Sequence, residues 1–454
     1  MTQNYLANTE LPLTEFTARR ERFFASMPAN SIALFPAAIE LTRSNDTEFP
    51  FCQNKNFYYL TGFPEPDAVL LLIKAEVNRV VLFSREKDAF KEVWQGRRIG
   101  QELAVSAYGL DECFTLDKQE SLIPDYITDK TSLLYCMGEN EPVSESFEAK
   151  VFDWLKAVKA KARLGKKAPT ELVDCSAIIH EMRLIKSEAE LEVMRKVNQI
   201  SGVAHQRAMQ KSAVGKYEYQ IEAEILHEFS SNGAKAPAYT SIVAGGDNGN
   251  ILHYTENSDC LKDNEMLLID AGGELAGYAA DITRTFPING VFNAEQKAIY
   301  QLVLDSQAIA IQDIKPQNTL AHLNKLTCDF LTEGLYNLGI LKGDLNTLLE
   351  EKACKKYFIH GLGHWLGLDV HDVGDYQSND KREQLRAFEP GIVMTIEPGL
   401  YIPLDDLSVE EKWRGIAVRI EDNILVTATG YENLTINAPK EVAEIEALMA
   451  KSLT

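Results

Sequence analysis

Three histidines lie in one short glycine-rich segment, residues 360–371, which reads "HGLGHWLGLDVH". His360, His364 and His371 lie there although the whole chain has only 8 histidines. A lone histidine in an apolar stretch is usually structural, but three beside conformationally free glycines favour a functional site. We interpret His364 as a candidate metal ligand, with His360 and His371 as hydrogen-bond donors around it.

Two aspartates stand in neighbouring strand-like runs. Asp270 closes "MLLID" and Asp281 lies in "YAADITRTF", with a glycine-rich turn between them. Adjacent strands lie about 5 Å apart, so two carboxylates on one face would meet and repel each other unless a counter-charge such as a divalent metal joins them. The alternative is that one aspartate points outward or pairs with Arg284.

Acidic residues also interrupt two β-branched runs late in the chain. Glu397 ends "IVMTIE", and Glu421 follows Arg419 by two residues in "VRIEDN". Residues two apart on a strand share a face, and charged groups inside such runs are uncommon unless they are paired or ligated. For Arg419 and Glu421 the alternative is an exposed polar strand face.

These observations give a candidate ligand set of four carboxylates and one imidazole: Asp270, Asp281, His364, Glu397 and Glu421. Such donors suit two divalent ions, with Mn²⁺ as the first choice and Co²⁺, Zn²⁺ or Fe²⁺ as competitors. A hydroxide formed at neutral pH between two metal ions is a nucleophile for hydrolysis. Its negative charge can be offset by four further side chains: His253, His360, His371 and Arg419.

The composition argues against nucleic-acid and membrane partners. The 454 residues carry 67 acidic and 46 basic side chains, a net charge of −21, which repels phosphate backbones and anionic lipid surfaces. The start, "MTQNYLANTELPL", has no basic flank before an apolar run, and the aliphatic runs are far shorter than the ~20 residues of a membrane span.

The 7 cysteines are scattered without CxxC spacing, which argues against a disulfide framework or a thiolate zinc site. We expect a cytoplasmic protein.

The elements that must position these residues divide into two groups. Buried-strand patterns at 31–37, 68–73 and 79–84 lead into a helix-like segment and predict an α/β first domain with a mixed sheet. The basic stretch 156–170 interrupts an acidic chain and is the best candidate for a domain boundary.

Helices and then strands follow this boundary. Ser187 and Glu190 form a capping-box pattern at the start of one helix, and "YEYQIEAEILHEF" predicts the next. Strands are predicted at "YTSIVAG", "NILHY", "EMLLIDAG" and "YAADITRTF", helices near 294–313 and 317–339, and strands again at "GIVMTIEPGLYI" and "GIAVRIEDNILVT". The second domain is therefore expected to hold helices around a hairpin-rich sheet.

Four segments resemble the proline peptidases of the pita-bread metallopeptidase family: "HGLGHWLGLDVHD", "LLIDAGGELAGYAADITRTFP", "MTIEPGLY" and "GIAVRIEDNILVT". In the first third, "TRSNDTEFPFCQNKNFYYLTGFPEPDAVLLL" and "VWQGRRIGQ" are similar to the amino-terminal domain of aminopeptidases in that family. The resemblance covers nearly the whole chain. It implies an α/β (α+β) protein with a smaller creatinase-like α/β amino-terminal domain at 1–174 and a pita-bread catalytic domain at 175–454.

The resemblance makes the five candidate ligands the holders of two metal ions, usually manganese in this type of enzyme. Asp281 and Glu421 would bridge the ions, His364 would bind one of them, and Glu397 would also act as general base. Gly363 departs from the pattern because serine often stands there in the family.

Around the metals, the resemblance implies that His253 and His371 contact the substrate and stabilise the oxyanion. His360 and Arg419 would support the site and shuttle protons. Five residues are implied near the substrate: Tyr239, Tyr401, Trp94, Asp46 and Arg163.

The implied activity is a metal-dependent exopeptidase that hydrolyses the Xaa-Pro imide bond at the amino terminus of peptides with proline in second place, through a metal-bridging hydroxide. A prolidase specific for Xaa-Pro dipeptides uses the same ligands and is the alternative. A non-catalytic peptide-binding protein of this fold would be expected to lack ligands. The family implies a homo-oligomer, a dimer or a tetramer.

Overall fold

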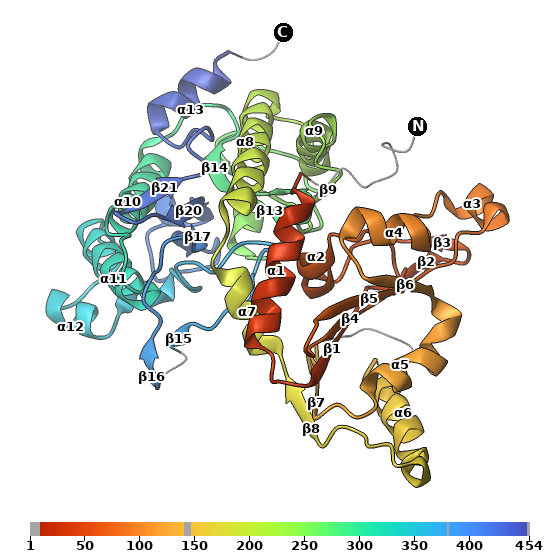
Figure 1. The fold of residues 1–454 in the computed structure, drawn as a ribbon. Helices are drawn as coiled ribbons and strands as arrows, with labels where there is room; N and C mark the ends of the chain where they lie inside the picture. Colours follow the sequence, from red (N-terminus) through yellow and green to blue (C-terminus); the bar gives the residue numbers. More distant parts are fainter. Residues whose placement is uncertain (1–9, 140–146, 379–380, 452–454) are drawn as a thin grey trace. The chain divides into compact units, whose positions relative to one another are not determined.

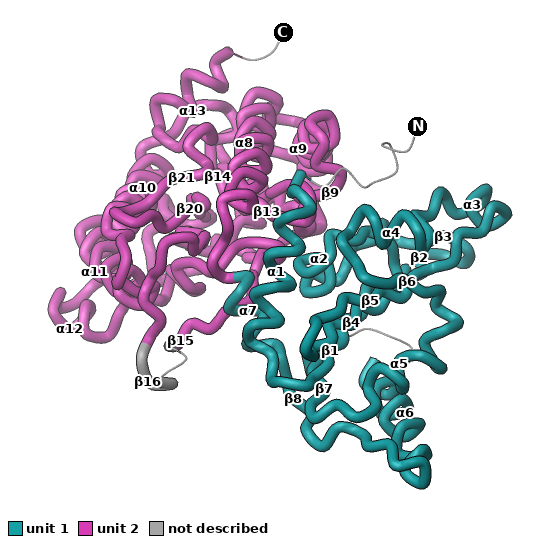
Figure 2. Tube along the Cα trace, in the orientation of Figure 1, with its two compact units in different colours: residues 1–183 teal, residues 184–454 magenta. Residues whose placement is uncertain are grey.

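The computed structural model describes residues 10–139, 147–378 and 381–451. The opening segment interpreted as lacking a secretory signal falls largely on residues 1–9, outside this range. The chain folds into two compact units, Met1–Arg183 and Leu184–Thr454 (Figure 2). The domain limits expected from the sequence, 174 and 175, stay a prediction.

The first unit is built on a six-stranded mixed sheet in the order β6-β5-β4-β1-β7-β8 (Figure 1). β1 pairs antiparallel with β4 and parallel with β7, so the predicted α/β unit with a mixed sheet is confirmed. The strands of this unit are β1 (Ser31–Pro36), β2 (Thr42–Ser44), β3 (Thr47–Glu48), β4 (Val69–Ile73), β5 (Arg79–Ser84), β6 (Glu112–Thr115), β7 (Ser132–Tyr135) and β8 (Glu171–Asp174). Its helices are α1 (Leu13–Ser26), α2 (Lys55–Thr61), α3 (Ala89–Gln95), α4 (Gln101–Tyr108), α5 (Gln119–Ile127), α6 (Phe147–Ala160) and α7 (Ser176–Leu184), with 3-10 turns η1 (Leu116–Lys118) and η2 (Ala162–Leu164).

The basic stretch at 156–170 lies inside this first unit. It covers the end of α6 and the turn η2, and β8 then adds the last strand to the sheet. Leu133 and Trp154 belong to the buried core beneath that sheet, together with Ile32 and Val81. Burial of these side chains away from water is what stabilises the unit.

The second unit has helices on both sides of its strands (Figure 1). The helices are α8 (Glu188–Lys211), α9 (Glu218–Ser231), α10 (Ala294–Gln312), α11 (Leu320–Asn337), α12 (Leu345–Glu350) and α13 (Val442–Met449), with 3-10 turns η3 (Gly246–Asn250), η4 (Ala353–Lys356) and η5 (Glu411–Trp413). The predicted capping box is confirmed: the Ser187 hydroxyl accepts from Glu190 N, and Ser187 N donates to the Glu190 carboxylate at 2.9 Å.

Short antiparallel strand groups fill the space between the helices, in the orders β10-β11-β14, β13-β12-β9, β17-β20-β21, β18-β19 and β15-β16. These strands are β9 (Ala236–Pro237), β10 (Ile242–Gly245), β11 (Met266–Asp270), β12 (Gly273–Leu275), β13 (Tyr278–Ala279), β14 (Thr283–Pro287), β15 (Gln377–Ser378), β16 (Lys381–Leu385), β17 (Val393–Ile396), β18 (Gly399–Ile402), β19 (Ile416–Arg419), β20 (Asp422–Val426) and β21 (Tyr431–Asn433). One predicted strand is wrong, since "NILHY" at 250–254 begins with the last residue of η3 and continues as a loop.

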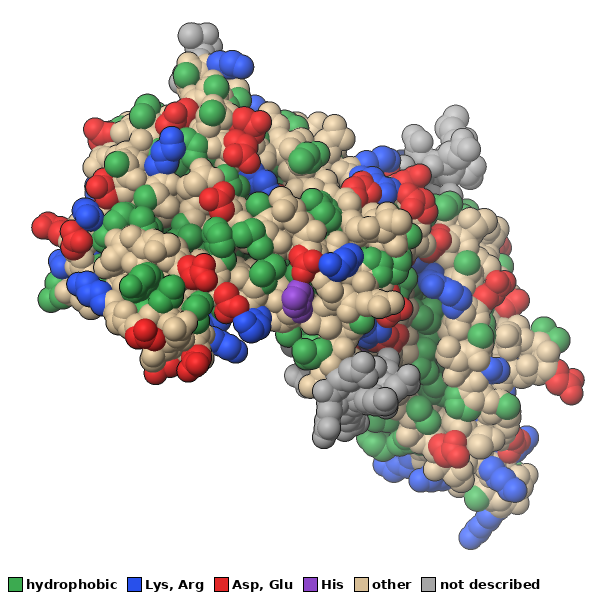
Figure 3. All heavy atoms as spheres, turned by 90° about the vertical axis from the view of Figure 1, so that its left-hand side faces the viewer, with side chains coloured by type: hydrophobic (Ala, Val, Ile, Leu, Met, Phe, Trp, Pro, Cys, Tyr) green, Lys and Arg blue, Asp and Glu red, His purple; other side chains and the backbone are tan. Residues whose placement is uncertain are grey.

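Charged groups of both signs are interspersed over the face drawn in Figure 3, so the net negative charge is not gathered into one patch there. Within the described part of the chain, every helix is too short or too polar to cross a membrane.

Candidate active site

The strand ends of the second unit converge on a cavity of about 280 Å³. Its lining includes all five candidate ligands and four more of the residues singled out from the sequence: Asp270, Asp281, His364, Glu397, Glu421, His253, His360, His371 and Arg419. Side chains separated by up to 168 positions in the sequence, from His253 to Glu421, thus meet around one space.

The two aspartates approach each other because β11 and β14 pair side by side. Asp270 ends β11 opposite Thr283, and Asp281 precedes β14 by two residues. The connection between them is more than a turn, since it forms the separate β12–β13 hairpin. The Tyr239 hydroxyl lies within hydrogen-bonding distance of both carboxylates, and its one proton can be donated to only one of them.

His364 enters the site on a segment that runs beside β17. Thr395 N donates to His364 O, and Glu397 N donates to Leu362 O, which fixes the segment against the strand. His364 Nδ1 lies 3.0 Å from Trp365 O, so the ring donates there and leaves Nε2 facing the cavity. Nε2 lies 3.4 Å from Asp281 Oδ2 and 3.4 Å from Glu397 Oε1.

Glu421 is held from the opposite side by the chain of β14. Its N–H donates to Thr283 O, and the Thr283 hydroxyl donates to Glu421 Oε2 at 2.7 Å. The same hydroxyl accepts from Arg419 Nε at 3.0 Å. Arg419 in turn pairs with Asp270 through Nη2 at 2.7 Å, so one cation is shared along this side of the site.

Burial makes the negative charge of this cluster costly. Removal from water raises the pKa of Asp270 to about 6 and that of Glu397 to about 7, and it raises the pKa of Glu421 well above its usual range. Burial acts on Asp281 in the same direction, but the hydrogen bond and charge of His364 lower its pKa instead.

His364 is a positively charged neighbour of these carboxylates. Burial opposes its positive charge, yet the hydrogen bond to Asp281 and the charge of Glu397 raise its pKa to about 9. Four carboxylates, of which Asp281 and Glu421 are buried and Asp270 and Glu397 partly exposed, therefore face two protein cations, Arg419 and His364. Because carboxylates outnumber cations here, a bound metal ion would bring the charges of the site closer to balance.

The donor atoms fit a divalent metal ion. Asp281, His364 and Glu421 each offer one ligand atom, and these three atoms lie within 4.8 Å of one another. Carboxylate oxygens with one imidazole nitrogen are the donor set of Mn²⁺ and its neighbours among divalent metals. No other such group of three histidine, cysteine or acidic residues is found in the described ranges.

A hydrogen-bonded chain leads from Arg419 to His360. Arg419 Nη1 donates to the Tyr401 hydroxyl at 2.9 Å, and that hydroxyl lies 2.8 Å from His360 Nε2. Burial and the charge of Arg419 lower the pKa of His360 to about 3, so its ring is neutral and Nε2 accepts the Tyr401 proton. His360 Nδ1 then donates to Gly361 O at 2.7 Å.

Two further histidines line the cavity. The His371 ring contacts the His364 ring edge-on at 4.2 Å between centroids, and burial followed by the charge of His364 lowers the pKa of His371. His253 is exposed and also lines the cavity. Both are therefore open to a molecule that enters the site.

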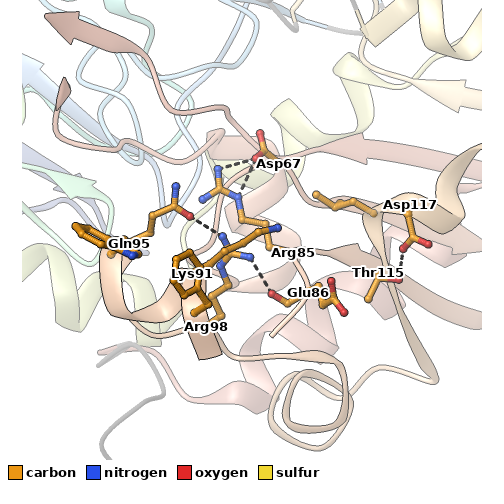
Figure 4. A pocket seen from close by; sticks show the side chains of 11 residues that line it. Asp67, Arg85, Glu86, Lys91, Gln95, Arg98, Thr115 and Asp117 are labelled. Atoms are coloured by element: carbon orange, nitrogen blue, oxygen red, sulfur yellow. Dashed lines mark hydrogen bonds and ion pairs between the residues drawn. The ribbon is translucent and has the colours of Figure 1, made fainter. Parts of the chain in front are cut away.

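Trp94, Asp46 and Arg163 lie in the first unit, on α3, in the β2–β3 turn and in η2. All three are exposed, Trp94 with 77% of its surface in water. Trp94 lines a larger cavity of about 570 Å³ in which Arg85 pairs with Asp67 (Figure 4). That cavity has the larger volume, but the converging ligand atoms belong to the second unit. The substrate roles of these three residues stay a prediction.

Two threonines of the site were not singled out by the sequence patterns. Thr283 and Thr395 are fully buried, and the Thr395 hydroxyl accepts from His364 N at 3.1 Å and lies 3.2 Å from Glu397 Oε1. Threonine is an ordinary strand residue, so nothing local to the sequence marks these hydroxyls. The structure also explains the glycine at position 363, because a Cβ there would lie 2.0 Å from Thr395 O.

Comparison with known proteins agrees with this geometry. The family model "Metallopeptidase family M24" matches residues 192–428, and the model "Aminopeptidase P, N-terminal domain" matches residues 16–135. A Haemophilus influenzae Xaa-Pro aminopeptidase is 44% identical over 441 residues, covering 97% of this chain and 98% of that protein.

Solved structures match over the whole chain as well. The structure of Pseudomonas aeruginosa aminopeptidase PepP is 45% identical with a TM-score of 0.95, and it covers 98% of this chain and 99% of its own. A zinc-substituted Escherichia coli aminopeptidase P in complex with product is 42% identical with a TM-score of 0.94, covering 98% of this chain and 99% of its own. With its pita-bread catalytic domain and the smaller domain before it, this chain belongs to metallopeptidase family M24.

Proposed function

We propose that this enzyme is a metal-dependent exopeptidase that hydrolyses the Xaa-Pro bond at the amino terminus of peptides with proline in second place. The observation that carries the proposal is the convergence of four carboxylates and His364 Nε2 on one small cavity. The names of the similar bacterial enzymes support the choice of substrate.

The proposed holders of the metal are Asp270, Asp281, His364, Glu397 and Glu421, with Asp281 and Glu421 shared between two ions. Mn²⁺ suits this donor set, with Co²⁺, Zn²⁺ and Fe²⁺ as alternatives. When bound, such ions lower the pKa of a water molecule and so supply the nucleophile for hydrolysis.

Glu397 is the proposed general base. Burial raises its pKa to about 7, which matches proton transfer near neutral pH. Its Oε1 lies 3.4 Å from His364 Nε2 and 3.2 Å from the Thr395 hydroxyl, so the carboxylate is oriented while it accepts a proton.

The imidazoles at the cavity have separate proposed tasks. His253 and His371 donate hydrogen bonds to the substrate and to the oxygen that gains negative charge in the transition state. The chain from Arg419 through the Tyr401 hydroxyl to His360 holds a neutral imidazole beside Glu397, with 3.7 Å between His360 Nδ1 and Glu397 Oε2. His360 is thereby suited to relay a proton toward the leaving group.

The proline of the proposed substrate sets the remaining requirements of the site. The Xaa-Pro bond has no N–H, and the proline ring fixes the direction of the chain. A suitable site has an apolar wall for the ring and no need of an amide donor. Leu252 is an apolar lining residue, and Tyr239, Tyr401, Trp94, Asp46 and Arg163 are the further proposed substrate contacts.

A prolidase, which takes only Xaa-Pro dipeptides, is the nearest alternative because it needs the same ligands. The match of residues 16–135 to the aminopeptidase P N-terminal domain favours the aminopeptidase. A non-catalytic peptide-binding protein is disfavoured because all five ligand residues are present and converge.

The test is steady-state cleavage of an Xaa-Pro-Yaa tripeptide and an Xaa-Pro dipeptide by metal-free protein, with Mn²⁺, Co²⁺ or Zn²⁺ added back. We expect metal-dependent release of Xaa from the tripeptide and at least about a hundredfold loss of kcat in Asp281→Asn. The matched control Asp305→Asn, at an exposed position on α10, keeps wild-type activity. Cleavage of the dipeptide alone would assign a prolidase instead.

A homo-oligomer, dimer or tetramer, and a cytoplasmic location are further predictions for this enzyme. Sedimentation equilibrium of the purified protein measures the first directly. A mass of a single chain at micromolar concentration would contradict it.

A further inference from the structure

His253 is carried by a long loop with little regular structure. The loop runs from the turn η3 at Gly246–Asn250 to residue 259, and residues 251–259 contain no helix or strand. Binding and catalytic groups are more often carried by loops than by the elements that the loops connect. A catalytic group on such a loop needs something that fixes the loop to the rigid elements around it.

Glu218, the first residue of α9, accepts three hydrogen bonds from this loop and a fourth from Gly245, the last residue of β10. Its Oε1 accepts from Gly245 N at 2.7 Å and from Asn248 Nδ2 at 3.0 Å. Its Oε2 accepts from the Tyr254 hydroxyl at 2.7 Å and from Asp259 N at 2.8 Å. The carboxylate thus connects both ends of the loop and the residue next to His253.

The Glu218 side chain is fully buried, so its carboxylate depends on these four donors to replace the hydrogen bonds that water would give. Two carboxylate oxygens offer about four acceptor positions, and the four donors fill them. In the described part of the chain no lysine or arginine pairs with Glu218, so neutral donors alone compensate its burial. A Cβ at Gly245 would lie 3.3 Å from Glu218 Oε1, so glycine permits the close approach.

We propose that Glu218 is a positioning residue, which holds the 246–259 loop so that His253 faces the substrate cavity. The inference rests on the proposed function for the role of His253, but the anchoring itself does not. Tyr254, the residue after His253, links the two directly, because its side chain belongs to a buried apolar cluster with Ile242 and Tyr401 while its hydroxyl donates to Glu218.

The chemistry of the carboxylate gives a specific prediction. In Glu218→Gln an NH₂ group replaces one acceptor oxygen and faces two donors, so at least one backbone N–H of Gly245 or Asp259 loses its partner. The loop is then released while the five metal-binding side chains stay in place. Metal binding should survive, and transition-state stabilisation by His253 should not.

The experiment is a double-mutant cycle on the metal-loaded enzyme with an Xaa-Pro-Yaa substrate, using Glu218→Gln and His253→Ala. We expect Glu218→Gln to lower kcat at least about tenfold with little change in KM, because the lost interaction acts in the transition state. In the His253→Ala background the same substitution should change kcat by less than about twofold. Tyr254→Phe removes one donor, preserves the packing, and should give a smaller loss with the same dependence on His253.

Hydrogen exchange tests the anchor without any activity. Amides at Gly245 and Asp259 should exchange at least about tenfold faster in Glu218→Gln than in the wild type. Glu190→Gln is the matched control, since it also changes a buried glutamate, one that accepts from the Tyr278 hydroxyl at 2.8 Å. That variant should leave both the exchange at 245–259 and kcat unchanged.

The proposal is overturned if Glu218→Gln exchanges and turns over like the wild type, or if its loss of kcat is equally large without His253. Should Glu218→Gln not fold, the same two criteria apply to Tyr254→Phe. If Xaa-Pro peptides are not cleaved at all, the proposed function fails, while the exchange data still decide whether Glu218 anchors the loop.

Discussion

At the scale of single residues, the candidate site contains buried hydroxyl groups as well as the proposed metal ligands. The Thr283 hydroxyl lies between the Arg419 guanidinium and the Glu421 carboxylate, accepting from one and donating to the other. It orients the carboxylate without adding charge. Groups that orient metal ligands in this way commonly change metal affinity when they are removed.

Thr283→Val tests this role, because valine keeps the shape and removes the hydroxyl. We expect metal affinity, measured by calorimetric titration of the metal-free protein, to fall about tenfold or more. Leaving the buried partners unpaired should also lower the free energy of unfolding by about 1–3 kcal/mol. Thr327→Val on α11 is the control, since its buried hydroxyl donates to Leu323 O inside the helix. Equal affinity in wild type and Thr283→Val would contradict the role.

The residues proposed as ligands stand out in the sequence and line one cavity, whereas the residues that orient them could not be recognised in the sequence. A carboxylate such as Asp270 or Glu397 at the end of an apolar run stands out by its chemistry. Thr283 and Glu218 look ordinary in sequence. The partner of Thr283 lies 138 residues away at Glu421, so only the folded chain brings the two together.

At the scale of elements, the two aspartates are held by a close backbone approach. A Cβ at Gly272 would lie 1.8 Å from Ala280 O, so the chain after Asp270 passes directly over the chain before Asp281. Only glycine permits this contact. The β12–β13 hairpin then closes the connection.

Gly272→Ala should therefore separate the two aspartate-bearing segments. We expect a loss of about 3 kcal/mol in the free energy of unfolding, measured with urea, because backbone rather than a movable side chain blocks the new methyl group. Metal content after dialysis should fall as well. Gly361→Ala is the matched control in the histidine segment, where a Cβ meets nothing within 4 Å. Similar stability of the two variants would refute the packing argument.

Most elements could be predicted from periodicity and caps. The strands near 31–37 and 79–84 and the capping box of α8 are examples. The predicted strand "NILHY" is wrong because its apolar residues serve a different purpose: Tyr254 packs into a small core and binds Glu218, while its neighbour His253 lines the cavity. Alternation of this kind has the period of a strand without its ladder of hydrogen bonds.

At the scale of the whole molecule, folding of the second unit brings more carboxylates than cations to one cavity. Four carboxylates come from strand ends far apart in the chain, so the metal-free protein contains electrostatic repulsion that bound metal removes. A metal that binds the folded state and not the unfolded chain also stabilises by mass action.

Removal of metal should lower the thermal stability of the second unit. With metal at about 100 times its Kd, we expect stabilisation of about 2.7 kcal/mol, measured as a shift of Tm by calorimetry. In Asp281→Asn the Tm should respond far less to added Mn²⁺. A wild-type Tm that does not change with metal would show that the cluster binds none under these conditions.

The most direct test of the account is anomalous diffraction from crystals of the protein soaked in Mn²⁺. We expect two anomalous peaks in the cavity of the second unit, each within bonding distance of carboxylates of the cluster, with His364 Nε2 bound to one of them. Active crystals whose metal peaks lie elsewhere, with the five side chains unligated, would contradict it.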